Sequence, residues 1–443
     1  MAASLYHELS DDNNGLVEAT IQCIPSKQDI RMDEEVPASR SNYEKSSSTS
    51  EWEVPEGGLR AWLVIAGAFL DLFSTFGLVN SYGVFQTLYT STILLFLLYF
   101  LSPIVGRIFD IYGSKVLLPL GTLLTPGSMM LLSICKDGSV YQFFLCHGIL
   151  FGIGNAIVFT PALAVVGHWF KRKRAYCIGL VSSGSALGGV IYPLMLQKLI
   201  PKIGFGWAVR IAAFLTFFCL SISSVTIRAR LPVKPKKRLT LKECVDLTGF
   251  RDSRYCLSAV GAFLSFYALF IPFFYIQEYA EFEGVSPKTA KYLLSITNAL
   301  GIPSRILPGI IADKFGSLNT LIPSTVLTSV LVFAVWLPSR GFSSIAAFSS
   351  LYGLFSGGFV SLLPAYIATI SPTEKIGGRL GSIYMVVGVA NLVGTPTAGA
   401  FLHEVNQTNF NGLIAFCGCM IFSAAFAYGI ARFIHSKRIL AIV

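Results

Sequence analysis

The residue with the clearest chemical potential is Arg305, which lies deep inside a mostly apolar segment, 290–311. An arginine at the centre of a lipid-spanning helix costs at least about 2.5–3.5 kcal/mol unless it faces water or a partner. Its guanidinium can bind an anionic group such as a carboxylate, or it can pair with a buried acid of the same chain. Both roles are open, and the first requires a central cavity.

A second ionisable group, Asp71, lies in the apolar segment 62–85. It is a candidate for taking up and releasing a proton, and helix packing is the alternative. Asn80 follows on the same segment at a spacing of about two and a half helical turns, so the two side chains are expected on opposite faces. Asn80 is the one assigned to a solute cavity.

Further polar and aromatic side chains inside apolar segments are candidates for contact with a solute. They are Asn155 and Phe159 in 141–167, Asn298 in 290–311, Ser361 in 343–369, and Tyr384 and Asn391 in 379–402. Each has a simpler interpretation, because intramembrane Asn and Ser often hydrogen-bond to neighbouring helices. The nine cysteines and isolated histidines lack the spacing of metal ligands, and neither a phosphate-binding loop nor a clustered catalytic set is apparent. We expect no metal, no cofactor and no enzyme activity.

The segments that must position these residues are long and apolar. Of 443 residues, 53% are hydrophobic and 13% charged, and the mean hydropathy is +0.64. A soluble protein could not bury that much apolar surface. Runs of about 18 or more apolar residues fit helices that cross a hydrocarbon core, in which every backbone group must be paired. The sequence predicts an all-α membrane protein.

Twelve spans in two sets of six are expected. The first set lies near 62–85, 91–107, 116–134, 141–167, 175–199 and 205–227, and the second near 255–276, 290–311, 320–338, 343–369, 379–402 and 411–434. The predicted domains are a disordered cytosolic tail (1–55), a first six-helix half (56–227), a basic cytosolic linker (228–254), a second half (255–434) and a short cytosolic tail (435–443).

The second span fits this scheme poorly. Its largely apolar run, 93–105, would be only about 20 Å long as a helix. The polar residues Thr87, Thr90, Ser91 and Thr92 would have to form both the turn and the helix start. Either a tight hairpin crosses a locally thinned bilayer, or residues are missing from the sequence here.

Lys and Arg residues cluster in the connections that face inward when both termini are cytosolic, as the positive-inside rule requires. The net charge of +10 is therefore explained by topology and the lipid bilayer, without a nucleic-acid partner. The plasma membrane is the expected location, with the vacuolar membrane as the alternative. In this orientation the sequon Asn406-Gln407-Thr408 falls on an outward loop, where Asn406 is a candidate for glycosylation.

Two turns, each after the second span of its half, share one pattern. They read Gly106-Arg107-Ile108-Phe109-Asp110-Ile111-Tyr112-Gly113-Ser114-Lys115 and Gly309-Ile310-Ile311-Ala312-Asp313-Lys314-Phe315-Gly316. Glycine permits close helix approach and a tight turn, and the aspartate can cap a neighbouring helix or pair with an arginine across the seam between the halves. Such a contact would lock one access state. The repetition indicates two related halves.

The duplicated turn resembles the signature of the major facilitator superfamily. Two more motifs, Glu56-Gly57-Gly58-Leu59-Arg60-Ala61-Trp62 and Trp169-Phe170-Lys171-Arg172-Lys173-Arg174-Ala175-Tyr176-Cys177-Ile178-Gly179, resemble those of its monocarboxylate-transporter family, in the fungal branch. The resemblance covers 56–434. It implies a fold of two pseudo-symmetric six-helix halves and gives Arg305 the role of holding a substrate carboxylate. Gly301 and Asn80 replace the family's acid and lysine, so the resemblance does not extend to lactate-type proton symport.

We therefore expect a secondary active transporter that moves a small organic solute, an organic anion or metabolite, by alternating access. A proton is a candidate co-substrate. Nutrient uptake and export of a secondary metabolite are both open, and nothing indicates whether an accessory subunit exists. A non-transporting receptor or a degenerate carrier is the alternative of a different class.

Overall fold

The computed structural model describes residues 56–80, 88–135, 139–230, 245 and 247–436. They belong to one compact unit, Val54–Val443. The predicted tails, apart from residues 435 and 436, and most of the predicted linker lie outside the described residues. The domain bounds given above stay a prediction.

The first half contains the helices before the linker. They are α1 (Leu59–Val79), α3 (Leu88–Phe100), α4 (Ser102–Tyr112), α5 (Ser114–Leu132), α6 (Val140–Phe143), the π-helix η1 (Phe144–Leu150), α7 (Phe151–Ala164), α8 (Val166–Trp169) and α9 (Arg174–Thr226). Helix α9 reverses at Gly204, whose φ of 80° is open to glycine but strained for other residues. It therefore supplies two spans.

The second half contains the remaining helices. They are η2 (Leu247–Arg251), α11 (Ser253–Leu269), α12 (Ile271–Phe282), α13 (Pro287–Ala290), α14 (Tyr292–Phe315), α15 (Ser317–Leu331), η3 (Val332–Trp336), α16 (Gly341–Thr369), η4 (Thr373–Lys375), α17 (Ile376–Phe401) and α18 (Gln407–His435). The described chain is thus nearly all helical, as predicted.

Within the described residues, ten helices are long and apolar enough to cross a membrane. Because α9 supplies two of the spans and is counted once, the number rises to eleven. Helix α14 is not among the ten, although its 24 residues would extend about 36 Å. With α14 included, the predicted twelve spans are confirmed.

The second span is longer than the sequence suggested. A continuous stretch of 23 residues, Thr90–Tyr112, is helical apart from a break at Leu101, and it would extend about 35 Å. Thr90, Ser91 and Thr92 are buried against other helices, so polar residues at the helix start do not shorten the span. The junction with α1, residues 81–87, lies outside the described residues, and the hypothesis of missing residues stays untested.

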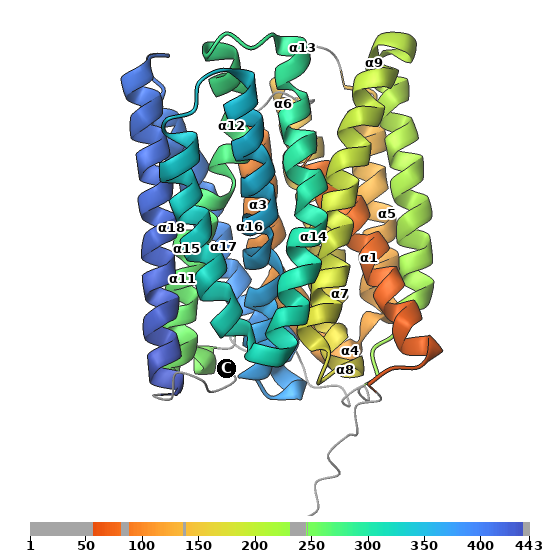
Figure 1. The fold of residues 1–443 in the computed structure, drawn as a ribbon. Coiled ribbons are helices and arrows are strands. Elements are labelled where there is room, and N and C mark those ends of the chain that lie inside the picture. Colours follow the sequence, from red (N-terminus) through yellow and green to blue (C-terminus); the bar gives the residue numbers. More distant parts are fainter. Residues whose placement is uncertain (1–55, 81–87, 136–138, 231–244, 246, 437–443) are drawn as a thin grey trace, which may run out of the picture. The chain divides into compact units, whose positions relative to one another are not determined.

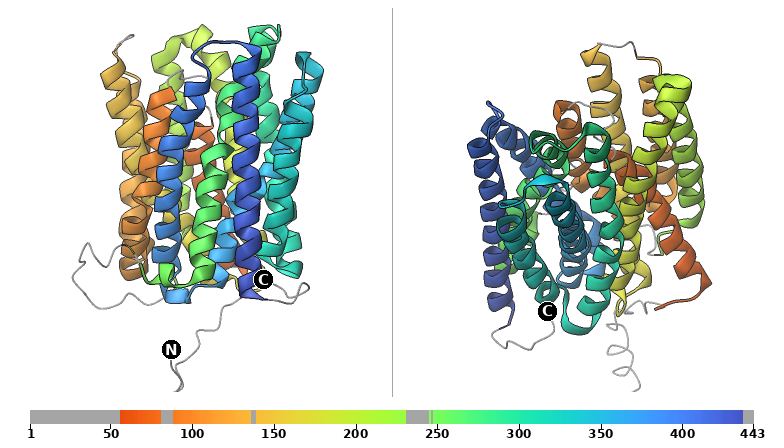
Figure 2. Two further views of the ribbon diagram at one scale, coloured as in Figure 1. Left: turned by 90° about the vertical axis from the view of Figure 1, so that its left-hand side faces the viewer. Right: turned by 45° about the horizontal axis from the view of Figure 1, so that its top comes forward.

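Helices of the two halves contact each other along a seam. Helix α9 packs against α14 and α16, and α17 packs against α3, α4 and α7. The right-hand view of Figure 2 shows the red-to-yellow helices of the first half on one side and the green-to-blue helices of the second half on the other. Helix α1 begins and α18 ends at the same end of the bundle as the two motif turns, the lower end in Figure 1. We call this the motif end and the other the opposite end.

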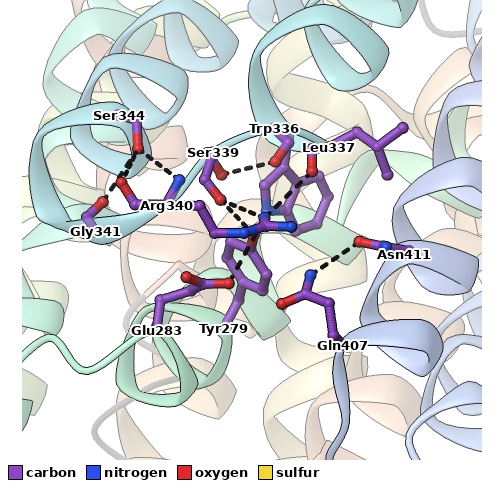
Figure 3. Close-up of polar contacts among 10 residues, drawn as sticks. All are labelled: Tyr279, Glu283, Trp336, Leu337, Ser339, Arg340, Gly341, Ser344, Gln407 and Asn411. Atoms are coloured by element: carbon purple, nitrogen blue, oxygen red, sulfur yellow. Dashed lines mark hydrogen bonds and ion pairs between the residues drawn. The ribbon is translucent and has the colours of Figure 1, made fainter.

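At the opposite end, polar contacts around Arg340 join two parts of the second half, α12 and the segment before α16 (Figure 3). Its guanidinium donates to the Tyr279 hydroxyl (2.9 Å) and to the Ser339 carbonyl (2.6 Å), and it lies 3.6 Å from the Glu283 carboxylate. Tyr279 also donates to Ser339 (2.7 Å). We call these four residues the Arg340 cluster. Since it links α12 to the segment before α16, it holds this end of the second half together.

Candidate functional site

At the motif end, each motif aspartate caps a helix of the other half. Asp110 accepts a hydrogen bond from the Gly378 amide at the start of α17 (2.9 Å). Asp313 accepts from the amides of Ala175 and Tyr176 at the start of α9 (2.9 and 3.0 Å). The first amides of a helix lack partners within the helix and carry its positive dipole end, so a carboxylate is stabilised there. Two equivalent caps therefore hold the halves together at this end.

The motif glycines make these caps possible. A side chain at Gly106 would overlap the carbonyl oxygen of Gly377, and one at Gly309 would come within 2.6 Å of the carbonyl oxygen of Ala175. The turns after the aspartates use Gly113 (φ 72°) and Gly316 (φ 98°), a backbone region that disfavours other residues. The motif thus combines close backbone approach with a fixed turn. Of its other members, Lys115 is exposed and Arg107 half-buried.

The two motifs that resembled the monocarboxylate-transporter signatures also contact each other at this end. The Glu56 carboxylate accepts from the amides of Lys171 and Arg172 (2.9 and 2.7 Å). The ring of Trp62 lies edge-on to Phe170, with 5.5 Å between centroids. The segment before α1 therefore braces the loop that leads into α9. Arg174, the first residue of α9, donates to the carbonyl of Ala368 in the second half (2.7 Å).

In the middle of the bundle, Arg305 is buried in the seam. Its side chain donates to the carbonyl of Gly301, one turn earlier in α14 (3.1 Å), while its Nε has no hydrogen-bond partner among the described residues. Among those residues no carboxylate lies close enough to form an ion pair with it. The proposed structural pairing with a buried acid is therefore not seen there, and the guanidinium retains capacity to bind another group.

Aromatic rings from both halves lie beside Arg305. Phe76 of α1, Tyr99 of α3 and Phe159 of α7 contact one another, and Tyr99 and Phe159 also contact Tyr384 of α17. Ring centroids are separated by 5.0 Å for Phe76–Phe159, 5.7 Å for Tyr99–Phe159, 5.3 Å for Tyr99–Tyr384 and 5.2 Å for Phe159–Tyr384. These are the distances of favourable aromatic pairs. We call these four residues the aromatic cluster.

A cavity of about 20 Å³ lies next to the cluster, lined among others by Phe76, Asn80, Tyr99, Ser185 and Arg305. It is too small for an organic solute, so the central site is closed in this conformation. A larger hollow of about 700 Å³ lies between α14, α15 and α16. Its lining includes Leu307 and Phe315, which are exposed on the outside of the bundle, so it belongs to the surface that lipid would cover.

An amide pair joins the halves next to this cavity. The Asn80 side chain donates to the Asn298 side-chain oxygen (3.2 Å) and to the carbonyl of Ser185 (3.4 Å). Asn298 in turn donates to the carbonyl of Leu294 (3.0 Å). This uncharged contact between the end of α1 and α14 lies about two helical turns before Arg305 along α14.

The remaining predicted residues are not part of this arrangement. Asp71 lies between α1 and the second arm of α9, with its carboxylate 3.5 Å from the Ser223 hydroxyl, away from the cavity-lining Asn80 as predicted. Ser361 and Asn391 bond to carbonyls one turn earlier in their own helices, and Asn155 is buried with no hydrogen-bond partner among the described residues. Asn406 caps α18 by accepting from the Asn409 amide (2.8 Å). Its glycosylation stays a prediction.

The sequence did not single out Phe76, Tyr99 or Ser185. An aromatic residue in an apolar run has the same local pattern whether it faces lipid or the seam. For Tyr99, the hydroxyl inside the run Leu97-Leu98-Tyr99-Phe100 was a usable signal, because a phenol in the middle of a span favours the bundle interior over lipid.

Comparisons with known proteins agree with this geometry. A family model described as Major Facilitator Superfamily matches residues 61–343 and 259–438. The chain is 38% identical to MFS-type transporter 1 of Ophiocordyceps sp., over 86% of this chain and 87% of that protein. It is 36% identical to the aspyridones efflux protein apdF of Emericella nidulans, over 86% and 82%. The crystal structure of the human organic anion transporter MFSD10 is similar with a TM-score of 0.64 at 14% identity, over 86% of this chain and all of that one.

Proposed function

Because this chain belongs to the Major Facilitator Superfamily and is a secondary transporter rather than an enzyme, we propose that it exports an amphipathic organic anion. The observation that supports an anionic solute is Arg305, a buried guanidinium in the seam with no acid partner among the described residues. A carboxylate or enolate would form charge-assisted hydrogen bonds with it and offset the cost of its burial.

The aromatic cluster supports a flat, conjugated carbon skeleton for this anion. Tyr99 and Phe159 belong to the first half and Tyr384 to the second, so a planar solute inserted between them would be held by both halves. Aromatic faces bind such skeletons by stacking, and few polar groups are needed to orient them. Of the other predicted residues, Asn80 and Asn298 lie close enough to contact the solute, whereas Asn155, Ser361 and Asn391 are weaker candidates.

The direction of transport is proposed from the relatives. One of the similar proteins is named as an efflux protein for a metabolite, which favours export over nutrient uptake. The finer family, the fungal monocarboxylate-transporter-like branch, is supported by the contact of Glu56 and Trp62 with the loop before α9. Export also favours the plasma membrane, with the vacuolar membrane as the alternative.

Alternating access would be controlled at the motif end, which we propose faces the cytosol together with both termini. The caps made by Asp110 and Asp313 hold this end closed here. To load a solute from the cytosol, the halves must rock apart at this end, and both caps must break together. Solute binding between the halves would then favour their closure.

A proton remains a candidate co-substrate, with Asp71 as its site. The carboxylate is fully buried between two helices of the first half, and no cation is paired with it among the described residues. An intramembrane acid of this kind is a candidate for proton transfer. Helix packing through Ser223 is the alternative. If the wild type and Asp71→Asn both continued to export solute without a proton gradient, the result would favour the packing role.

The experiment for the anion compares metabolites in cells and medium with and without the protein, followed by Arg305→Gln on the solutes that differ. Losing hydrogen bonds to a charged group costs about 1.5–3 kcal/mol, so we expect about a 10–150-fold loss of transport for anionic solutes. The matched control is Arg210→Gln, since Arg210 bonds Ser133 at the opposite end and does not line the site. Unchanged export of an anion by Arg305→Gln would exclude the proposed role.

A further inference from the structure

The opposite end of the first half brings two cysteines together. Cys135 follows the end of α5, and Cys146 lies in the π-helix η1, at the start of the fourth span. Their sulfur atoms are 3.9 Å apart, and both side chains are half-buried. The other described cysteines are buried (Cys177, Cys219 and Cys417) or exposed (Cys256 and Cys419), and no second pair of sulfur atoms is in contact among them.

The contact is held in place by the surrounding chain. The wide turn of η1 changes the direction of its side chains relative to a regular α-helix. Near it, the ring of Phe143 packs on Phe205 of α9, with 5.8 Å between centroids. On the α5 side, Arg210 of α9 donates to the Ser133 hydroxyl (3.0 Å). Helix α9 thus contacts both elements that carry the cysteines.

We propose that Cys135 and Cys146 form a disulfide bond in the mature protein. The inference rests on the orientation given under Proposed function, which places this end outside the cytosol, where disulfides persist. A disulfide has an S–S distance of about 2.05 Å, so the two sulfur atoms must approach by about 2 Å. Rotation of the two side chains about their Cα–Cβ bonds can move the sulfur atoms together by about this distance.

The oxidant would be the disulfide of a protein dithiol–disulfide donor in the secretory pathway. One cysteine loses its proton, attacks a sulfur of the donor disulfide, and releases the first donor thiolate. The second cysteine then attacks the resulting mixed disulfide and releases the other donor thiolate, which closes the Cys135–Cys146 bond. One S–S bond is broken and one is formed, the donor gains two electrons, and the two cysteine protons pass to the donor thiolates.

A donor is needed because the thiol pair itself is not reactive. Burial and the neighbouring Cys146 raise the pKa of Cys135 to about 11. Little thiolate is then present at neutral pH, and uncatalysed oxidation is slow. The bond would play the part that the Arg340 cluster plays in the second half, joining the outer ends of neighbouring spans so that the half moves as one body.

The test uses the full-length protein in intact cells. Free thiols are blocked at acid pH with one maleimide, disulfides are reduced, and the released thiols are labelled with a heavier maleimide for peptide mass spectrometry. We expect the heavy label on Cys135 and Cys146 and the light label on Cys256. In Cys135→Ser, Cys146 should carry the light label. Reduction should lower the melting temperature of the wild type by at least about 2 °C and leave that of the Cys135→Ser/Cys146→Ser variant unchanged.

A light label on both cysteines in the wild type would overturn the proposal. A second measurement separates this result from a failure of the orientation. Cells are treated with a membrane-impermeant reductant and then with a membrane-impermeant maleimide. Labelling of Cys135 but not Cys256 supports the orientation, and equal labelling of Cys135 when the reductant is left out would overturn the disulfide alone. Labelling of Cys135 only after permeabilisation would overturn the proposed orientation and with it the disulfide that rests on it.

Discussion

The two halves meet in different ways at the motif end and in the middle of the bundle. At the motif end, carboxylates and glycines of one half contact backbone amides and carbonyls of the other. In the middle, side chain meets side chain, through the aromatic cluster and the pair Asn80–Asn298. Contacts to the backbone form only when the two helices are in one relative position, so they are made or broken together. Side-chain contacts can be replaced by those of a solute, which suits a binding site.

The largest effect is expected from blocking backbone approach at the motif end. In Gly106→Ala the new methyl group would overlap the carbonyl of Gly377, so the halves cannot close there. We expect at least about a tenfold loss of transport, because alternating access needs both closed ends. The measurement is the transport rate per molecule of membrane-inserted protein.

The matched control is Gly127→Ala in α5, where an added methyl group meets nothing within 4 Å. A cysteine introduced at Ser356, which lines the central cavity, should also become more accessible from the motif side in Gly106→Ala. Equal transport and equal accessibility in the two variants would show that close approach at Gly106 is not required.

A smaller effect is expected from weakening one cap without adding bulk. Asp313→Asn retains one acceptor oxygen for the two amides of Ala175 and Tyr176 and loses the charge that favours a helix N-terminus. A loss of about 1–2 kcal/mol corresponds to a roughly 5–30-fold shift toward the conformation open at the motif end. Accessibility of the cavity cysteine from the motif side measures the shift.

Asp252→Asn is the matched control, because Asp252 caps α11 within its own half. Its pKa is lowered by the hydrogen-bonded guanidinium of Arg254, so it too is a charged cap. The control should leave the access equilibrium unchanged. If both variants shifted accessibility equally, charge at this end in general, and not the contact between halves, would be responsible.

The same contrast explains what could be predicted from the sequence. A turn with positive φ and a carboxylate at a helix N-terminus demand particular residue types at fixed spacing, so Gly113, Asp110 and their counterparts were recognisable. Apolar length was a clear signal for the spans other than α14, which is long but less apolar. The aromatic cluster could be predicted only in part, because Tyr99 and Phe76 sit in apolar runs whose orientation depends on packing between distant helices. Asp71 and Asn80 lie along the same segment, and helical periodicity was enough to place their side chains on opposite faces.

A moderate effect is expected within the aromatic cluster. Tyr384→Leu removes a ring that packs on Tyr99 and Phe159, and such ring pairs are worth about 0.5–1.5 kcal/mol each. We expect KM for a flat anionic solute to rise about 2–12-fold, whereas Tyr384→Phe, which keeps the ring, should stay close to wild type. If the Phe variant were as impaired as the Leu variant, the hydroxyl and not the aromatic face would contact the solute.

The smallest effect concerns the amide pair, which combines a side-chain contact with a connection between the halves. Hydrogen bonds between membrane helices contribute about 0.6 kcal/mol on average, so a double-mutant cycle of Asn80→Ala and Asn298→Ala should give about threefold coupling in KM. Coupling is expected because Asn80 donates directly to Asn298. A value above about tenfold would place the pair among the contacts that hold the halves closed, as at the motif end. Strict additivity would mean that the bond has already been replaced by solute or water in the state that limits transport.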